Sequence, residues 1–417
     1  MGYTFLTDNL LKYLTDNNNL RLVIYNGSDE QDIFHEMTVA IKSRSVKPLY
    51  RLYLLNYDET IKEDITDDLL DGGSISITFQ SGIRRNLNIT LDNSTGKWNP
   101  SPVSGYLWKD SKFRMDIGLQ LKSGEAWTQM GIFIPNDPSL SFAQDTKTVS
   151  LQLSDKFASL DGSLGGKLSS SLTVALDSNI ESSLSQLLTQ SRINNAPYDV
   201  KQLHFPVEYQ NETTMYTITK TDETTIGELA LEFGNMLSCD VYYDNEGYLT
   251  FEKGNYSLSS SDSPVIWDFD DNDLECLDSS VNVSFSKAYN AVTVIGANIE
   301  GDLVSYTARN ENPKSASNIW SLEPTVLRIT DDNIYSDELA RQRAEYELFK
   351  QGLLTITYSF KCTFMPILDV NKIVMVSNSE YGFENIPFLI QSVNIPISQK
   401  DNDVSLTMVN VNEVTLK

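Results

Sequence analysis

The stretch YSDELARQRAEYELFKQGLLTITYSFKCTFMPILDVNKIVMV, Tyr335–Val376, changes from helical to strand periodicity within a few residues. Ser336 suits a helix N-cap, and Asp337 and Glu338 follow in the first turn, where the helix dipole favours negative charge. Apolar residues then recur at four-residue spacing, and Gly352 is placed to end the helix. These signals predict a helix over residues 336–350, with one face formed by Ala340, Ala344 and Leu348.

Beyond that helix, apolar and polar residues alternate from Leu354 to Phe364. This period is typical of an antiparallel strand with one buried and one solvated face. Cys362 falls on the apolar side, so we expect a buried, reduced thiol. Pro366 ends the strand because proline cannot donate to a ladder, and 373–376 begins the next strand.

Similar alternation recurs through the first half of the chain. The segments are 51–55, 75–79, 87–91, 113–121, 127–134 and 149–153, with turn residues between them. Short strands in this number predict a β-barrel or sandwich over residues 50–160. Residues 1–49 are an N-terminal extension of uncertain fold, in which Phe5–Leu14 is a candidate helix and Leu20–Tyr25 a candidate strand.

The middle of the chain, 161–262, has a different pattern. Residues 161–171 are rich in Gly and Ser, as in a connector. Helical spacing follows in Leu172–Leu188 and again in Thr225–Leu237, where Thr225 and Glu228 form a capping box. A hairpin is expected over Asp240–Phe251, so this part is predicted to be a small α+β insert.

Residues 263–417 return to strand patterns, including 281–285 and 292–296. The predicted fold is therefore mainly β: two β-barrel-like domains in tandem, separated by the α+β insert. The second barrel carries the helix 336–350.

Composition limits the possible functions. Of 417 residues, 57 are acidic and 32 are basic, which gives a formal charge of −25. Binding to a phosphate backbone depends on Lys and Arg, so specific nucleic-acid binding is not expected. The three cysteines are far apart, which argues against a disulfide framework and a zinc site. No signal sequence or long apolar run is present, and we expect synthesis in a reducing cytoplasm.

Motifs for catalysis are missing from the sequence. The two histidines, His35 and His204, belong to no triad or metal motif, and His204 beside Phe205 favours a packing role. Gly162–Gly165 has the wrong spacing for a nucleophile elbow. We therefore predict no catalytic and no cofactor-binding residues. A hydrolase that uses a pair of carboxylates remains an alternative function, because the distance between two carboxylates depends on the fold.

One acidic cluster resembles a calcium loop: Asp268, Asp270, Asp271, Asn272 and Asp273. However, Asp273 stands where the loop needs glycine, and Ser279 stands where a bidentate glutamate is needed. A solvated turn is the favoured interpretation, with adventitious cation binding as the alternative. No metal site is predicted.

Aromatic residues suggest an alternative function. Trp98, Tyr106 and Trp108 lie close in sequence and could stack on a sugar, as in a carbohydrate-binding or adhesin-like β protein. Such residues more often fill the core or an interface of a β protein. The sequence leaves both readings open.

Several short runs are informative in combination: Asp71–Ser74, Gly82–Leu87, Leu91–Asn93, Val149–Phe157, Thr225–Leu229 and Leu339–Ala344. With the hairpin up to Tyr248 and the strand up to Pro366, they resemble baseplate-hub proteins at the tail tip of tailed bacteriophages. Type VI secretion spike proteins share that hub architecture, so a related injection device is also possible. The resemblance covers roughly residues 50–417.

The resemblance implies a structural protein of the virion tail tip or baseplate, assembled in the host cytoplasm. Three copies, each with two barrels, would form a pseudo-six-fold ring that adapts the six-fold tail tube to a three-fold spike or fibre assembly. The implied partners are further copies of the chain, the tail tube or distal tail protein, and a central spike or tail-fibre protein. Phage DNA would pass through the ring, and an acidic wall would repel its phosphates. Many relatives carry a peptidoglycan hydrolase; because this sequence ends at Lys417, we expect none here.

Overall fold

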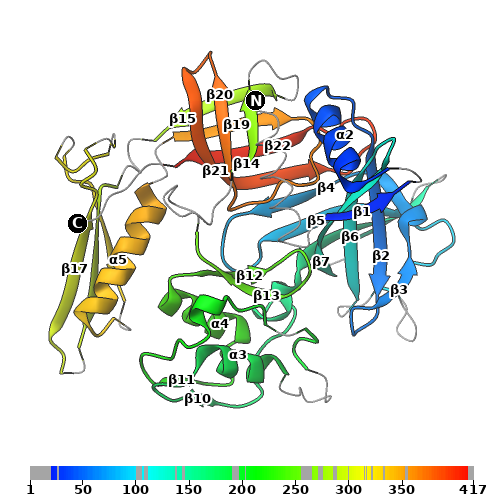
Figure 1. The fold of residues 1–417 in the computed structure, drawn as a ribbon. Coiled ribbons are helices and arrows are strands. Elements are labelled where there is room, and N and C mark those ends of the chain that lie inside the picture. Colours follow the sequence, from blue (N-terminus) through cyan, green and yellow to red (C-terminus); the bar gives the residue numbers. More distant parts are fainter. Residues whose placement is uncertain are drawn as a thin grey trace.

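The computed structural model describes residues 20–411 except 26–27, 100–105, 108–110, 137–138, 143–145, 190–196, 202, 255–264, 271–275, 285–288, 299, 314, 316, 321–322, 332–333 and 353–355. The chain is mainly β, as predicted, and falls into three visible parts (Figure 1). A large sheet lies at the top and right, a small helical module lies below it, and a three-stranded sheet with one helix lies at the left.

The first part supplies most of one half of the large sheet. Its elements are β1 (Leu20–Ile24), α2 (Glu30–Lys42), β2 (Pro48–Leu55), β3 (Ile61–Asp64), η1 (Thr66–Asp68), β4 (Leu69–Thr78), β5 (Arg85–Asp92), β6 (Lys112–Gln120), β7 (Gly124–Pro135), β8 (Ser139–Phe142), β9 (Lys147–Asp155) and η2 (Lys156–Ser159). The strands predicted here are confirmed. Helix α2 was not predicted; its buried stripe of Ile33, Phe34, Met37 and Ile41 packs into the main core.

The second part has its own hydrophobic core. Its elements are β10 (Leu172–Val174), α3 (Ile180–Thr189), η3 (Val207–Tyr209), β11 (Ile218–Lys220), α4 (Ile226–Leu237), β12 (Asp240–Tyr243) and β13 (Leu249–Glu252). The capping box of α4 is confirmed: Thr225 Oγ1 accepts from the Glu228 N–H, and the Glu228 carboxylate accepts from the Thr225 N–H. The prediction of one helix over Leu172–Leu188 is wrong at its start, because Leu172–Val174 pairs with β11 instead.

The third part contains β14 (Val265–Asp270), β15 (Cys276–Val283), β16 (Ala291–Ala297), β17 (Leu303–Arg309), β18 (Val326–Thr330), α5 (Asp337–Gly352), β19 (Ile356–Cys362), β20 (Ile373–Asn378), β21 (Phe383–Pro396) and β22 (Val404–Asn410). The helix predicted over 336–350 is α5, and Ser336 Oγ accepts from the Leu339 N–H at 3.3 Å. The alternating strand after it is β19, with Cys362 buried as predicted.

The two β regions do not form separate closed barrels among the described residues. Their strands join in one 15-stranded sheet with the main order β15-β19-β22-β21-β4-β5-β9-β7-β6-β2-β3. The link is β21, a 14-residue strand whose first half pairs with β20 and whose last residues pair with β4. Because the last residues of β21 pair with β4, that edge of β21 is hydrogen-bonded to the first β region. The strands of the second β region therefore need not close into a barrel to avoid an open edge.

This seam between β4 and β21 is apolar on one face. Ile75 lies opposite Ile395 and Ile77 opposite Val393, and all four side chains are buried. They belong to one core that contains residues of both β regions. The packing of the strands is continuous across this seam. The division of the chain into domains stays a prediction, with the boundaries 1–49, 50–160, 161–262 and 263–417.

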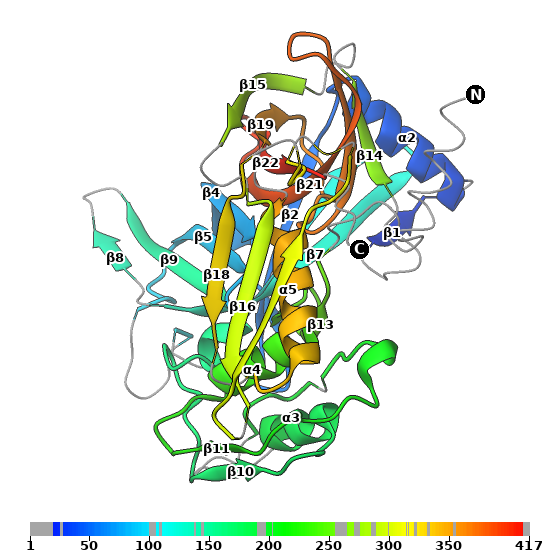
Figure 2. The same cartoon turned by 90° about the vertical axis from the view of Figure 1, so that its left-hand side faces the viewer.

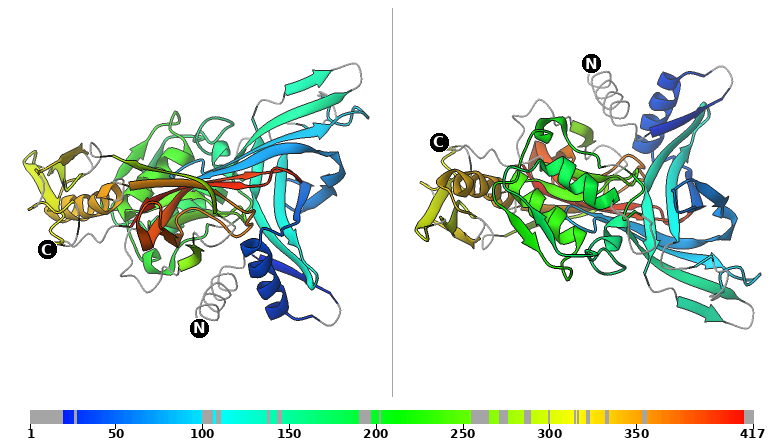
Figure 3. Two further views of the ribbon diagram at one scale, coloured as in Figure 1. Left: turned by 90° about the horizontal axis from the view of Figure 1, so that it is seen from above. Right: turned by 90° about the horizontal axis from the view of Figure 1, so that it is seen from below.

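Strands β17, β16 and β18 form a separate sheet, with β17 antiparallel and β18 parallel to β16. Helix α5 packs on one face through Val292, Val294, Ala340, Ala344 and Leu348. The helix lies between this sheet and the rest of the molecule, so the other sheet face points outward (Figure 2). Seen from above and below, this unit forms one end of an elongated molecule and the strands β1–β9 form the other end (Figure 3).

No helix within the described ranges combines the length and apolar character needed to span a membrane.

Candidate functional site

The residues singled out in the sequence do not come together in one site. The His204 side chain is 68% exposed rather than packed, because Phe205 takes the inward position on this extended segment. His204 Nδ1 lies 3.5 Å from the Asp244 carboxylate, whose hydrogen bond raises the pKa of His204. His35 is exposed on α2. The interpretation of His204 as a packing residue was therefore wrong.

The aromatic cluster is part of the core. Trp98 is completely buried and packs edge-on against Tyr106 at 5.7 Å between ring centroids. A buried indole cannot stack on a sugar, so Trp98 offers no support for carbohydrate binding. Trp108 lies outside the described residues.

The acidic cluster is described only in part. Asp268 and Asp270 belong to β14, whereas 271–273 lie outside the described residues. Within the described ranges, no three His, Cys, Asp or Glu side chains are grouped so that they could hold a metal ion.

The most elaborate side-chain chemistry lies where the parts of the chain meet. One such place, which we call the arginine junction, consists of Arg84, Arg85, Tyr242, Glu252 and Asp369. The Arg84 guanidinium lies 3.2 Å from the centroid of the Tyr242 ring and donates to Glu252 Oε2 at 3.2 Å. Tyr242 donates to the same oxygen at 2.8 Å, and Arg85 donates to Asp369 Oδ2 at 2.7 Å. The junction thereby connects β5, the β12–β13 hairpin and the turn before β20.

Both arginines of the junction are almost completely buried, at 1% and 2% exposure. Burial opposes ionisation of Glu252, but the charges of Lys372 and Arg84 hold its pKa below the ordinary value. A planar guanidinium can stack on a ring and bind a carboxylate at the same time, which a lysine cannot do as well. The three connected segments are therefore held in one orientation.

The end of β9 supports the arginine junction through the backbone. The Asp155 carboxylate accepts from the N–H groups of Arg84 at 2.8 Å, Arg85 at 2.9 Å and Phe157 at 3.0 Å. Burial raises the pKa of Asp155 to about 6, and these N–H donors oppose the rise. Asp155 thus fixes the start of β5 at the point where the chain enters the insert.

A second place, the lysine junction, consists of Glu59, Lys112, Lys156, Asp199 and Tyr243. Glu59 Oε1 lies 2.7 Å from both Lys112 Nζ and Lys156 Nζ. Lys156 also donates to Asp199 Oδ1 at 2.6 Å, and Tyr243 donates to Asp199 Oδ2 at 2.7 Å. The Glu59, Lys156 and Asp199 side chains are at most 3% exposed. Buried charges in this arrangement connect the β2–β3 turn, β6 and η2 to the insert.

The tip of the β12–β13 hairpin docks directly on β7. Gln129 donates to the Asn245 carbonyl at 2.8 Å, and Asn245 donates to the Gln129 carbonyl at 3.1 Å. Gly247, at φ +84°, lies so close to Ile132 that an added Cβ would come within 2.7 Å of its side chain. The insert is therefore held against the sheet at several points.

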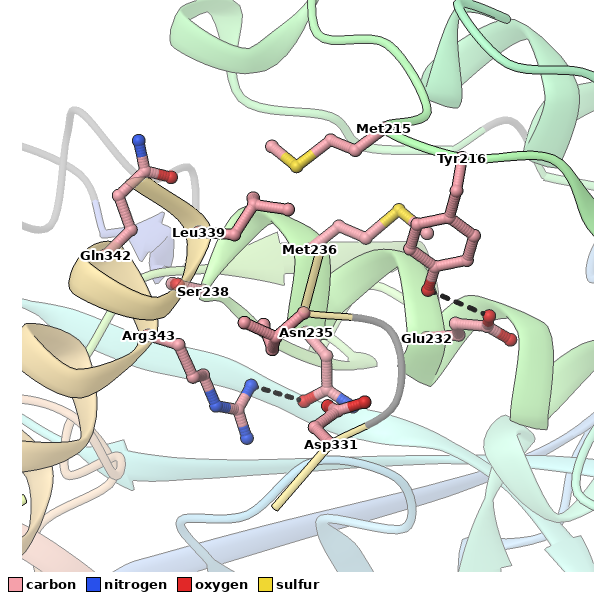
Figure 4. A pocket seen from close by; sticks show the side chains of 11 residues that line it. Met215, Tyr216, Glu232, Asn235, Met236, Ser238, Asp331, Leu339, Gln342 and Arg343 are labelled. Atoms are coloured by element: carbon pink, nitrogen blue, oxygen red, sulfur yellow. Dashed lines mark hydrogen bonds between the residues drawn. The ribbon is translucent and has the colours of Figure 1, made fainter. Parts of the chain in front are cut away.

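A small cavity lies between the insert and the α5 unit (Figure 4). Tyr216 donates to Glu232 on one side, and Arg343 donates to Asn235 at 3.0 Å on the other. Its solvent-accessible volume is only about 60 Å³, which is room for a few waters and not for a substrate.

The sequence did not identify the two junctions. Glu59, Lys112, Lys156 and Asp199 look like surface charges in a chain with many acids, and their neighbours in space are distant in sequence. The adjacent pair Arg84–Arg85 after Gly82 was a usable signal, because it lies in a run that also carries the family resemblance.

Comparisons with known proteins agree with this architecture. Residues 313–414 match the family model described as Domain of unknown function (DUF5048). No protein with a curated description matches the sequence. The tail protein from Neisseria meningitidis has a similar structure, with a TM-score of 0.58 and 11% identity over 88% of this chain and 97% of that chain.

Two further solved structures are similar. The 43 kDa tail protein of prophage MuSo2 from Shewanella oneidensis gives a TM-score of 0.55 at 13% identity, over 87% of this chain and 98% of that chain. A chain of the half-lidded Francisella PdpA–VgrG complex gives 0.54 at 10% identity, over 100% of this chain and 65% of that chain. At these identities the likeness concerns the fold: the chain has the fold of phage tail proteins along most of its length.

Proposed function

We propose, from a fold shared with phage and prophage tail proteins, that this protein is a structural hub of a phage tail or a related injection device. In this role three copies form a ring that adapts a six-fold tail tube to a three-fold spike or fibre assembly. The observation that carries the proposal is the match to two tail proteins over nearly the whole of each chain.

The arrangement of strands supports a ring. Each copy contributes two β regions joined by the β4–β21 seam, so three copies would present six β regions around an axis. Closed rings require the same surface to be repeated in each copy. Two regions held in one continuous sheet keep a fixed relative orientation, which such repetition needs.

The junctions support a role based on shape. A chain that transmits load between a tube and a spike must resist reorientation of its parts. The arginine and lysine junctions fix the insert through buried charged hydrogen bonds, which are lost together if the insert moves. The cavity beside α5 is too small for a substrate, and we propose no catalytic role.

The proposed partners are further copies of this chain, a tail tube or distal tail protein, and a central spike or tail-fibre protein. The proposed location is the tail tip or baseplate of the virion. DNA would pass through the ring without specific binding. The charge of −25 favours such a passage, because an acidic wall repels phosphate.

The proposal is tested by measuring the mass of the purified protein in solution and imaging it, alone and in purified tails, by electron microscopy. We expect a three-fold particle with a central hole, seated at the tail tip. A purified tail without the chain, or a particle whose two β regions line no common pore, would contradict the proposal. A basic pore lining would contradict the argument about DNA passage separately.

A further inference from the structure

One face of the three-stranded sheet carries mostly exposed or half-buried side chains, and among its central positions Ala291 alone is buried. This outer face, as we call it, is formed by side chains that alternate with the inward residues packed on α5: Thr293, Ile295, Leu303, Ser305, Thr307, Arg309, Val326, Arg328 and Thr330. The sheet stands in front of α5 when viewed from outside (Figure 2). This sheet is mixed, with one antiparallel and one parallel pair, and it carries a helix on a single face.

The pairing register arranges the outer face in rows. Arg309 and Val326 flank Ala291, Thr307 and Arg328 flank Thr293, and Ser305 and Thr330 flank Ile295. The central strand β16 contributes Ala291, Thr293 and Ile295 to these rows, and such small or β-branched side chains leave the surface flat. Leu303 at one end is 76% exposed, and Val326 at the other end is 40% exposed.

Two arginines on this face differ from the other arginines. Arg309 and Arg328 are exposed, and within the described ranges neither guanidinium makes an ion pair or a hydrogen bond. The other described arginines all have partners: Arg44, Arg51, Arg84, Arg85, Arg114, Arg341 and Arg343 contact a carboxylate, and Arg21 donates to Gln129. In a chain with 57 acids, two unpaired guanidinium groups on one flat face are a local exception.

A tryptophan is presented at the Arg309 end of the same sheet. Trp320 is 75% exposed, although its loop is held by buried polar groups. Asn310 donates a hydrogen bond to Ser317 Oγ at 3.0 Å, and the backbone N–H of Trp320 donates one to Asn318 Oδ1 at 2.8 Å. The Ile319 N–H donates to the Asn310 carbonyl, which ties the loop to the end of β17. A tryptophan exposed next to these hydrogen-bonded residues has the character of an interface hot spot.

We infer that the outer face and Trp320 together form a docking surface for an acidic segment of another tail protein. The two arginines supply bidentate donors for carboxylates, and Trp320, Leu303 and Val326 supply the apolar contacts. The inference rests on the proposed function for the identity of the partner. A nucleic acid fits this face less well, because two cations in a strongly acidic chain give little attraction for phosphate.

The experiment uses the full chain in assembled tails. The photo-reactive residue p-benzoylphenylalanine replaces Leu303, tails are purified and irradiated, and cross-linked peptides are identified by mass spectrometry. The same residue placed at Val207, which is 80% exposed on the insert, serves as the positional control. We expect Leu303 to cross-link to one segment of another tail protein with net negative charge, and Val207 not to reach that segment.

Charge variants then test the chemistry. Arg309→Glu combined with Arg328→Glu should reduce the Leu303 cross-link at least tenfold, and Trp320→Ala should reduce it several-fold. Lys361→Glu, a charge reversal at an exposed position of β19, should leave it unchanged. Unchanged melting temperatures of all these variants would show that the fold is retained.

Three results would overturn the inference while the chain is present in tails: cross-links only to other copies of this chain, cross-links to a segment without excess acid, or no cross-link from Leu303. If the chain were absent from purified tails, the proposed function would be contradicted, and with it the assignment of the partner to another tail protein.

Discussion

At the scale of single residues, the buried charges of the lysine junction were beyond the reach of sequence analysis. Whether a glutamate is solvated or buried depends on residues that the fold brings to it. Glu59 lies in a turn, with φ +68°, and the sequence of this turn is like that of an ordinary exposed polar turn. Capping residues were predictable because their partners are three positions away, as for Thr225 and Glu228.

Replacing Glu59 by Gln should destabilise the protein by about 3 kcal/mol, because removing one partner of a buried ion pair leaves Lys112 and Lys156 poorly compensated. Chemical unfolding at pH 7 measures the change. Glu223→Gln is the matched control: the Lys167–Glu223 pair has the same 2.7 Å separation but is exposed, so its loss should leave the free energy of unfolding nearly unchanged. Equal costs for the two variants would contradict the role assigned to burial.

The effect of Glu59→Gln on the free energy of unfolding should depend on pH. Burial opposes ionisation of Glu59, yet Lys156 and Lys112 hold its pKa below the ordinary 4.5. A carboxylate whose pKa is lowered on folding contributes stability above pH 4.5 and loses it as the pH falls through the lowered pKa. The difference in unfolding free energy between the wild type and Glu59→Gln should therefore be constant near neutral pH and shrink below pH 4.5. A difference that grew on acidification would contradict this sign.

At the scale of elements, alternation and capping predicted most strands and the helices α4 and α5. The prediction failed for Leu172–Val174, where pairing partners 44 to 48 positions away decide the conformation more than local spacing does. It missed α2, although Asp29 and Asp32 form a capping box there. Closure into barrels was also wrong, because pairing between strands far apart in sequence leaves no local signal.

Strand β4 offers a test of one such pairing. Gly73 approaches β5 so closely that a Cβ would lie 2.5 Å from the Asn88 carbonyl oxygen, whereas a Cβ at Gly72 would meet nothing within 4 Å. Both glycines have positive φ, so alanine is strained at either position by about 1 kcal/mol. Gly73→Ala should cost about 2 kcal/mol more than Gly72→Ala in thermal or chemical unfolding, since backbone must shift. Similar costs would mean that β4 and β5 separate easily.

At the scale of the whole molecule, the β4–β21 seam makes the two β regions one structural unit. Ile395 is completely buried opposite Ile75. Ile395→Ala should destabilise the protein by about 3 kcal/mol through the cavity it leaves. Hydrogen exchange should accelerate in β4 as well as in β21, because the seam is shared. Glu384→Ala, at an exposed position of β21, should change stability by less than about 0.5 kcal/mol. Acceleration confined to β21 would show that the halves unfold independently.

The seam also constrains how the chain can be made. The side chains of Ser76 and Asn394 are hydrogen-bonded at 2.8 Å although they are 318 positions apart, so β4 has no neighbour on that side until β21 has left the ribosome. During that interval the nascent strand presents an open edge, which invites pairing with other chains. A fragment ending before β21 should therefore precipitate when expressed, and productive folding in the host should depend on chaperones that shield this edge until β21 has been synthesised.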